Sequence, residues 1–419
     1  MHTLEELRSG KLQGLKRVKI SQNLTEFPME ILDLADTLEI LDLSFNSLSS
    51  LPKEISRLTK LKIAFFSNNL FTAVPSELKE CRNLYMLGFK ANKIQRFDED
   101  ILPLSISWLI LTDNKIPSLP DSMGKLVKLQ KLVISGNQIQ YIPNTMVGCV
   151  NLELVRISAN KLQEIPSWFL NLPKLSWLAF SGNPCVSTPK FELDCVEFES
   201  LHVGKLLGEG ASGEIYKAYS KELNTDVAIK FFKGSVTSDG YAKDEMNACL
   251  GVKKHENLIN VIAKISGADR EGLLLEYIPT EFKNLGNPPN FDTCTRDTYE
   301  DDLAFSVEAI HKISSSIASV ATHMHEAHLM HGDLYAHNIL INSQSKCYLG
   351  DFGAASFYDS GEDAYEKLEV RAYGCLLEDL LQRCSDIDSK IYKSLDSLKI
   401  KCLSVNLQER PFFKDMFFE

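Results

Sequence analysis

Residues 38–46 read LEILDLSFN, and variants of this pattern recur through the first 183 residues of the chain. Successive copies start 22 or 23 residues apart, and each has an Asn eight residues after its start. The copies begin at Leu15, Leu38, Leu61, Leu84, Ile106, Leu129, Leu152 and Leu175. A fixed period of this size predicts an array of equivalent stacked units instead of a single globular core.

The residue types in each copy indicate a short strand followed by a turn. The third and fifth residues after the start, such as Leu41 and Leu43, are expected to point into the core. The Asn side chain is expected to bond backbone groups at the turn, and pairs such as Leu51-Pro52 end the strand. An array of amphipathic helices would need a 3.6-residue period and few prolines. The pattern resembles leucine-rich repeats, which implies a solenoid of eight repeats over residues 1–183.

The second and fourth residues after each start are expected to face the concave surface of the solenoid. Surface positions are normally polar, but several of these are apolar: Ile63, Phe65, Met86, Trp108, Ile110, Val133, Leu154 and Trp177. An apolar strip with two Trp predicts a binding site for a protein substrate or regulator. The alternative is that the strip packs on another part of the same chain; we favour the external partner.

The bulk composition narrows the class of protein. The 419 residues suggest two or three domains, and the 44% hydrophobic content allows real cores. A net charge of −11 does not predict nucleic-acid or anionic-membrane binding. The N-terminus does not resemble a signal peptide, and the sequence contains no run of about 18 apolar residues. We therefore expect a cytoplasmic protein without a membrane span, in which the ten Cys are reduced.

The segment 184–200 connects the repeats to the rest of the chain. It contains Phe191, Val196 and Phe198 and is neither Gly/Ser-rich nor Pro-rich. A flexible tether would be more polar. We therefore expect it to cap the solenoid and to fix one module against the other.

Residues 207–215 read LGEGASGEI, a Gly-rich pattern that lets a backbone close over phosphates. On its own the pattern is weak, because it also opens dinucleotide-binding folds. Here it is followed by two expected strands, 214–220 and 226–232, instead of a helix. The second strand contains VAIK, which ends at Lys230. A helix expected over about 238–252 carries Glu245, the favoured ion-pair partner of Lys230, with Asp244 as the alternative.

Residues 331–338 read HGDLYAHN, and residues 351–353 read DFG. Together with the Gly-rich pattern and VAIK, in this order, they make residues 201–419 resemble protein kinases. The resemblance implies a bilobal fold that uses ATP and Mg²⁺. In such a fold Asp333 orients the substrate hydroxyl, and Asn338 and Asp351 hold the metal. Lys230 and Glu245 complete the catalytic set. The implied nucleotide contacts are Leu207, Gly208, Gly210, Gly213, Ile215, Ala228, Lys230, Glu276, Ile278 and Leu340.

The sequence departs from the family around the peptide-binding surface. Gly332 replaces the Arg that receives an activation-loop phosphate, and Tyr335 replaces the Lys of Ser/Thr kinases. His337 stands where tyrosine kinases have Arg. The activation segment spans only 354–366, before a helix expected near Lys367, and lacks the A-P-E whose Glu pairs with the Arg corresponding to Arg410. In that helix Glu369 replaces the family's Asp.

The expected fold class is a multidomain chain, α/β plus α+β. A leucine-rich-repeat solenoid (1–183) and a capping linker (184–200) precede a bilobal kinase fold (201–419) with a shortened activation segment. The expected function is ATP-dependent phosphorylation of protein hydroxyls, Ser/Thr in preference to Tyr, with the repeats recruiting substrate or regulator. One alternative is an ATP-binding pseudokinase scaffold with little transfer activity. The other is an interaction protein whose kinase fold is only structural.

Overall fold

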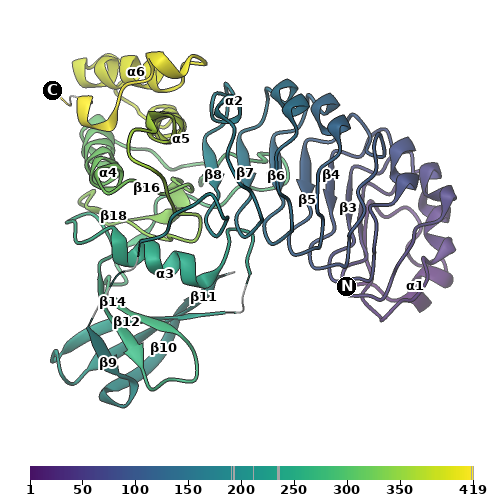
Figure 1. The fold of residues 1–419 in the computed structure, drawn as a ribbon, viewed down its shortest axis with the longest axis horizontal. Helices are drawn as coiled ribbons and strands as arrows, with labels where there is room; N and C mark the ends of the chain where they lie inside the picture. Colours follow the sequence, from purple (N-terminus) through teal and green to yellow (C-terminus); the bar gives the residue numbers. More distant parts are fainter. Residues whose placement is uncertain (190, 192–193, 211, 234–235, 417, 419) are drawn as a thin grey trace. The chain divides into compact units, whose positions relative to one another are not determined.

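The computed structural model describes residues 1–419 except 190, 192–193, 211, 234–235, 417 and 419, and the chain divides into two compact units (Figure 1). The first unit contains Met1–Lys174 and Asn183–Cys185. The second contains Leu175–Gly182 and Val186–Glu419. This division differs from the expected boundary at residue 183, because the strand-forming part of the eighth repeat groups with the second unit.

The first unit is a ladder of short parallel strands, most of them followed by a helical turn (Figure 1). After helix α1 (Leu4–Arg8), the strands are β1 (Arg17–Lys19), β2 (Ile40–Asp42), β3 (Ile63–Phe65), β4 (Met86–Gly88), β5 (Trp108–Ile110), β6 (Lys131–Val133) and β7 (Leu154–Arg156). Equivalent positions pair from repeat to repeat, as in Ile40 with Ile63 and Met86 with Trp108. The structure therefore confirms the predicted repeat solenoid.

Proline begins most of the helical turns that follow the strands. Pro52, Pro75 and Pro120 each directly precede a 3₁₀ helix, as do Pro28 and Pro143. These helices span Met29–Leu34, Lys53–Arg57, Ser76–Glu80, Asp121–Lys125 and Asn144–Gly148, and Pro166 precedes α2 (Ser167–Leu170). Proline has no amide hydrogen and a fixed φ near −65°, so it ends strand pairing and starts a helix without losing a hydrogen bond.

The core of the first unit consists of the residues predicted to point inward. Leu41, Leu43 and Leu132 are at most 1% exposed. Between repeats, the rings of Phe66 and Phe89 stack with centroids 5.1 Å apart. Each repeat buries its apolar residues against its neighbours and not within itself, which is why the repeats are stable only as an array.

The Asn side chains form the predicted ladder along the turns. Asn114 Nδ2 donates to the carbonyl oxygens of Phe89 and Leu111, at 2.9 and 3.0 Å, and its Oδ1 accepts the amide of Ile94 at 3.0 Å. The same pattern joins neighbouring repeats at Asn46, Asn69, Asn92, Asn137, Asn160 and Asn183. In every repeat after the first, one Asn amide thus satisfies backbone groups for which the turn has no ladder partner.

The small lobe of the second unit is a six-stranded sheet in the order β10-β11-β12-β14-β13-β9. Its strands are β9 (Cys195–Glu197), β10 (Leu201–Glu209), β11 (Gly213–Ser220), β12 (Thr225–Phe232), β13 (Val261–Ser266) and β14 (Gly272–Glu276), with helix α3 (Ala242–Gly251) after β12. The strands expected over 214–220 and 226–232 are confirmed within one residue. Helix α3 is shorter than the expected 238–252.

The end of the predicted linker belongs to this sheet and not to a solenoid cap. Strand β9 pairs in parallel with β13, with Val196 opposite Ile265. Val196 is 7% exposed and lies in the same hydrophobic cluster as Val227 and Leu274. Val196 and Phe198, which suggested a cap, therefore pack in the core of the small lobe, whereas the Phe191 ring lies 5.8 Å from that of Phe357.

The large lobe is mainly helical (Figure 1). Its helices are α4 (Val307–Glu326), α5 (Asp363–Leu381) and α6 (Lys390–Cys402). Its short strands are β15 (Lys283–Asn284), β17 (Ile339–Ile341) and β18 (Cys347–Leu349) in one sheet, and β16 (Leu329–Met330) with β19 (Ser356–Phe357) in another. Helix α5 begins four residues before the expected Lys367, so the activation segment is even shorter than the sequence suggested. In the described part of the chain, no helix combines the length and apolar character that a bilayer crossing requires.

The Asn ladder leads to a first prediction. Replacing Asn114 by Ala leaves buried backbone groups of two repeats without partners, so the first unit should lose about 2 kcal/mol of unfolding free energy. Hydrogen exchange of the β5 amides measures this loss. Asn83→Ala is the matched control, because Asn83 is exposed and its side chain donates only to Thr59 O. Equal protection in the two variants would show that the ladder does not stabilise the array.

Candidate functional site

The Gly-rich turn joins β10 to β11 and is open where a ligand would approach. Gly208 pairs with Ile215 across the two strands, and the Gly210 amide donates to Gly213 O at 2.9 Å. A Cβ atom at Gly208 or Gly210 would meet nothing within 4 Å, whereas at Gly213 it would lie 2.4 Å from the carbonyl oxygen of Phe231. Gly213 is therefore required by close packing, and the other two leave space above the turn. Ala211 lies outside the described residues.

Lys230 on β12 forms a buried ion pair with Glu245 on α3. Of the two carboxylates considered on this helix, the structure pairs Glu245 with Lys230 and not Asp244. Burial alone would lower the pKa of Lys230, but the charges of Glu245 and Asp351 raise it above its usual value. The ammonium group is thus fully protonated and is fixed with its charge beside the opening of the cleft.

A cavity lies between the two lobes of the second unit and contains the central residues of the predicted site. Gly210, Gly213, Ile215, Lys230, Glu245 and Asp351 line it, together with Cys249, Ile259 and Leu273, which the sequence did not identify. Six predicted contacts are not among the described residues that line this cavity: Leu207, Gly208, Ala228, Glu276, Ile278 and Leu340. Ala228 nevertheless lies opposite Leu275, a lining residue, in the β12–β14 pair.

The end of β14 and the residues after it include two of the predicted nucleotide contacts, Glu276 and Ile278. The amide of Glu276 donates to Asn260 O at 2.9 Å, and its carboxylate accepts Asn260 Nδ2 at 3.0 Å. The Glu276 amide is therefore already bonded within the small lobe. Ile278 is half-buried two residues beyond the end of the strand. Leu340 lies on β17, where it pairs with Tyr348.

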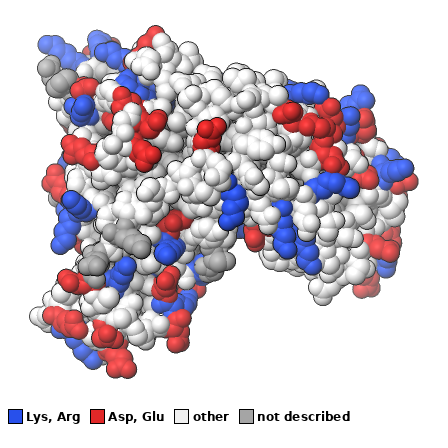
Figure 2. Space-filling view, viewed as in Figure 1, with Lys and Arg blue, Asp and Glu red and all other residues white. Residues whose placement is uncertain are grey.

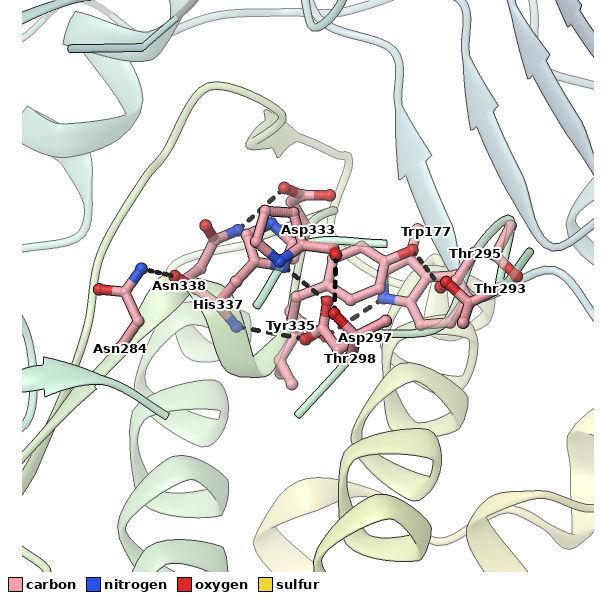
Figure 3. Close-up of polar contacts among 12 residues, drawn as sticks. Trp177, Asn284, Thr293, Thr295, Asp297, Thr298, Asp333, Tyr335, His337 and Asn338 are labelled. Carbon is pink, nitrogen blue, oxygen red and sulfur yellow. Dashed lines mark hydrogen bonds and ion pairs between the residues drawn. The ribbon is translucent and has the colours of Figure 1, made fainter. Parts of the chain in front are cut away.

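Asp333 and Asn338 meet in the catalytic loop (Figure 3). Asn338 Nδ2 donates to both the backbone oxygen and Oδ2 of Asp333, each at 2.9 Å. Asp351, after β18, accepts the Gly353 amide at 3.2 Å and lines the cavity with Lys230. The spacing of five residues predicted that Asp333 and Asn338 belong together, and the structure brings them into direct contact.

These donor groups fit a divalent cation that is shared with phosphate oxygens. Because Asn338 Nδ2 donates to Asp333, its Oδ1 is the amide atom left for a cation, and Asp351 supplies a carboxylate. Mg²⁺ is usually held by one or two protein oxygens together with phosphates and waters. Among the described residues, no cluster of three or more His, Cys, Asp or Glu side chains could hold a metal without such help.

The carboxylate of Glu369 on α5 holds the start of the catalytic loop. Its Oε2 accepts the His331 amide at 3.1 Å, its Oε1 accepts the Gly332 amide at 2.7 Å, and His325 Nε2 lies 2.9 Å from Oε2. Burial would raise the pKa of Glu369, but the hydrogen bond and charge of His325, with the loop contacts, lower it below its usual value. Glu369 is 1% exposed, so the substitution of Glu for the family's Asp preserves an anchor for the loop.

Asp297 is a site residue that the sequence did not reveal. It lies in an Asn- and Pro-rich loop, and its Oδ1 is 2.7 Å from His337 Nδ1 (Figure 3). Burial would lower the pKa of His337, but the hydrogen bond and charge of Asp297, with Asp333 and Asp351, raise it. The pair therefore favours a cationic imidazole one residue before Asn338. The sequence contains no signal for it, because 40 residues separate the partners.

Arg410 is buried, and backbone oxygens accept its hydrogen bonds. Its Nη1 donates to Lys367 O at 3.0 Å and its Nε to Ser404 O at 2.8 Å. Burial, with the nearby charge of Arg371, lowers the pKa of Arg410 to about 10. Carbonyl oxygens thus bind the guanidinium at a position where the family uses a Glu from the A-P-E motif.

The predicted apolar strip on the repeats is largely buried. Ile63, Met86, Val133, Leu154 and Trp177 are at most 5% exposed, whereas Phe65, Trp108 and Ile110 are half-buried. Long side chains cover their neighbours: the Phe65 ring lies where a Cβ at Gly88 would be only 2.8 Å away, and Lys131 lies over the Trp108 ring at 4.1 Å. Figure 2 shows acidic and basic side chains interspersed over the visible face of the first unit. The expectation of an exposed strip with two Trp is therefore wrong for most of its members.

Comparison with known proteins finds similarity in both parts of the chain. A model described as protein kinase domain matches residues 201–375. Two models described as leucine rich repeat match residues 105–162 and 37–58.

The curated relatives that match this chain include several proteins named as kinases. The serine/threonine-protein kinase TIO of Arabidopsis thaliana is 28% identical over 159 residues, which cover 38% of this chain and 11% of the relative. Cyclin-dependent kinase 11.2 of Caenorhabditis elegans is 24% identical over 42% of this chain and 26% of its own length. The L-type lectin-domain containing receptor kinase IX.2 of A. thaliana is 30% identical over 36% and 21%. The chain thus spans less than a third of each of these relatives.

The buried ion pair generates a second prediction. Glu245→Ala leaves Lys230 charged and buried without its partner, so the second unit should lose about 3 kcal/mol of unfolding free energy. Urea denaturation of the full chain measures it. The matched control is Asp244→Ala, one residue earlier on α3, which should cost less than about 1 kcal/mol. A larger loss for Asp244→Ala would show that the two carboxylates have been assigned the wrong roles.

Proposed function

We propose that this chain, in which leucine-rich repeats precede a protein kinase domain, transfers the γ-phosphoryl group of ATP to Ser or Thr hydroxyls of proteins. The observation that carries the proposal is that the Gly-rich turn, Lys230 and Asp351 line one cavity, and that the catalytic loop adjoins it through the bond from the Gly350 amide to Asn338 O. Lys230 is paired with Glu245, Asp333 is bonded to Asn338, and Asp351 lines the same cavity as Lys230. The names of relatives such as the serine/threonine-protein kinase TIO support Ser/Thr as acceptors.

The nucleotide is expected to bind with its phosphates under the Gly-rich turn. The open space at Gly208 and Gly210 lets the backbone approach the phosphates. Lys230 provides a fixed positive charge for the α- and β-phosphates, and the Glu276 carbonyl and Ile278 amide are the proposed partners of adenine. The wall formed by Ile215 and Leu275 would pack against the base.

Asn338 and Asp351 would hold Mg²⁺, which when bound neutralises charge on the phosphate oxygens. In the transfer itself, Asp333 accepts the proton of the substrate hydroxyl as the hydroxyl oxygen bonds to the γ-phosphorus. The bond from that phosphorus to the bridging oxygen breaks at the same time, and ADP leaves. The chain supplies alignment and electrostatic stabilisation and forms no covalent intermediate.

A cationic His337 would supply positive charge near the transferred group. The family Lys is replaced by Tyr335, whose ring stacks on His337 with centroids 5.0 Å apart. The carboxylate of Asp297 raises the pKa of His337 and so favours the protonated imidazole. This arrangement supports an active enzyme over an ATP-binding scaffold, because a protein that only binds ATP does not require a cation at this position.

Buried thiols that form no disulfide are consistent with a reducing compartment such as the cytoplasm. Cys81, Cys149, Cys249, Cys347 and Cys402 are of this kind. Burial raises the pKa of Cys81 and of Cys149 to about 11, which keeps both protonated. Their thiols point to the carbonyl oxygens of Ile55 and Met123.

The decisive test is transfer of labelled γ-phosphate from ATP–Mg²⁺ to the chain itself and to a protein mixture. Label should appear with the wild-type chain and decrease by about a thousandfold or more with Asp333→Asn, since the hydroxyl then lacks its proton acceptor. Phosphoamino-acid identification should give phosphoserine or phosphothreonine. Asp302→Asn, at an exposed carboxylate, is the control and should leave transfer unchanged. ATP binding without any label from the wild type would instead support the scaffold.

The repeats are proposed to recruit the protein substrate or a regulator through the concave face. Ile110 and Phe65 keep part of their surface accessible on this face, and leucine-rich repeats commonly bind proteins there. Ile110→Asp should therefore reduce kcat/KM for a cognate protein substrate by about tenfold, without changing transfer to a short peptide. Val127→Asp, at a residue 51% exposed outside the strands, is the matched control. An equal loss with the peptide would assign the effect to folding and not to recruitment.

A further inference from the structure

The strand of the eighth repeat, β8 (Trp177–Ala179), lies in the second unit with the catalytic loop. We propose that residues 175–182 are a built-in positioning element for this loop, with Trp177 as the positioning residue. The inference deepens the proposed kinase function and rests on it. In this chain the element takes the place of a phosphorylated activation segment.

Trp177 makes two different contacts with the residues that follow Asp333 (Figure 3). Its ring stacks on Tyr335 with centroids 4.4 Å apart and an interplanar angle of 8°. Its indole Nε1 donates to the carbonyl oxygen of Leu334 at 3.1 Å. Trp177 is 1% exposed. Because one contact fixes a side chain and the other fixes the backbone, together they define the direction in which the loop leaves Asp333.

Tyr335 transmits this restraint to the rest of the loop. Its hydroxyl donates to Thr295 O at 2.9 Å, and its ring also stacks on His337. The Asn338 amide in turn donates to Tyr335 O at 3.1 Å. Trp177 therefore acts on Asn338 and His337 through Tyr335 and touches neither a reacting atom nor a proposed metal ligand.

Gly332 explains why the strand can approach so closely. Its φ is +73°, and a Cβ atom there would lie 2.5 Å from Leu178 O and 2.6 Å from Ala354 O. Any side chain would clash with two backbone carbonyls at once and would also be strained. At the position where the family places a phosphate-binding Arg, the backbone of β8 fills the space. The loss of the Arg and the presence of the strand are thus one structural change.

The same segment also orders the short activation segment. The Phe180 amide donates to Ser356 Oγ at 3.1 Å, and the Phe180 ring stacks on Tyr365 with centroids 4.8 Å apart. Tyr365 in turn stacks on Tyr358 at 5.0 Å. On α5, Arg371 Nη1 donates to Ser176 Oγ at 2.7 Å. Residues 176–180 therefore contact the catalytic loop, the activation segment and the central helix.

An inhibitory strand would make different contacts. It would cover the reacting groups or separate them, whereas here Asp333 keeps its bond to Asn338 and Lys230 keeps its pair with Glu245. The strand contacts Leu334 and Tyr335 of the loop, on the side where Tyr335 is buried. The geometry thus points to a strand that supports the active arrangement.

The test compares full-length wild type with Trp177→Ala and Trp177→Phe. Trp177→Ala should lower kcat by about tenfold or more, because the loop is no longer fixed in position, while the affinity for ATP–Mg²⁺ stays unchanged. Trp177→Phe keeps a stacked ring but loses the hydrogen bond, so it should recover part of kcat. Trp168→Ala is the matched control, since Trp168 lies one repeat earlier in the first unit and its indole donates to Asn144. An unchanged kcat in Trp177→Ala would overturn the inference, and a raised kcat would identify an inhibitory strand.

A second readout separates this inference from the proposed function. Hydrogen exchange of the Asn338 amide does not require catalysis and should be faster in Trp177→Ala than in wild type or in Trp168→Ala. If wild type transfers no phosphate but the exchange is faster, the proposed function fails and the positioning contact stands. Equal exchange rates in the three chains would overturn the positioning role, whatever the activity.

Discussion

The carboxylate of Glu369 accepts the two backbone amides that precede Asp333, and the placement of the catalytic groups depends on this buried contact. A carboxylate that is 1% exposed is costly unless its oxygens are fully hydrogen-bonded. His325 and the amides of His331 and Gly332 satisfy that requirement. Glu369 lies on helix α5, most of whose residues are buried in the large lobe. This contact therefore fixes the loop to a well-packed helix. The longer Glu side chain performs the task that the family gives to Asp.

Other positions at which the chain departs from protein kinases lie in the same loop and can be understood from its contacts. A side chain at Gly332 would meet the backbone of the eighth repeat, so the Arg of the family cannot be accommodated. Tyr335, which replaces a charged residue, is buried between the rings of Trp177 and His337. His337, two residues further along the loop and bonded to Asp297, is the proposed source of the positive charge that is absent at Tyr335. At Gly332 the chain lacks a group that would bind an activation-loop phosphate, and at Tyr335 it has a ring that packs on Trp177 instead of a charged group.

The parts that the sequence predicted well are those set by local pattern. The period of Asn and Leu residues predicted the ladder of repeats, since each repeat contacts only its neighbours. Asp333 and Asn338 were predicted to lie together because their spacing is fixed within one loop, and the structure places them in contact. Asp297 could not be found, because its partner His337 is distant in sequence and its loop carries no motif. Val196 was interpreted as part of a cap, since apolarity alone does not say which core a segment joins. The sequence placed the start of helix α5 too late. The helix begins at Asp363, but Glu362 and Asp363 carry no apolar periodicity that would have indicated this start.

Trp177 is the residue for which the repeat pattern of the sequence was least informative. Its position in the repeat is that of a concave-face residue, and an exposed Trp there would normally indicate a partner. The structure instead buries it against Tyr335. Salt has little effect on an aromatic stack of this kind, and dephosphorylation cannot remove it. An Arg–phosphate contact is weakened by salt and is lost when the phosphate is removed. A loop ordered by apolar contacts is therefore ordered whenever the chain is folded. Under the proposed function, the strand would replace a reversible electrostatic switch by a permanent packing contact, and control of transfer would act elsewhere, at substrate recruitment or at access to the cleft.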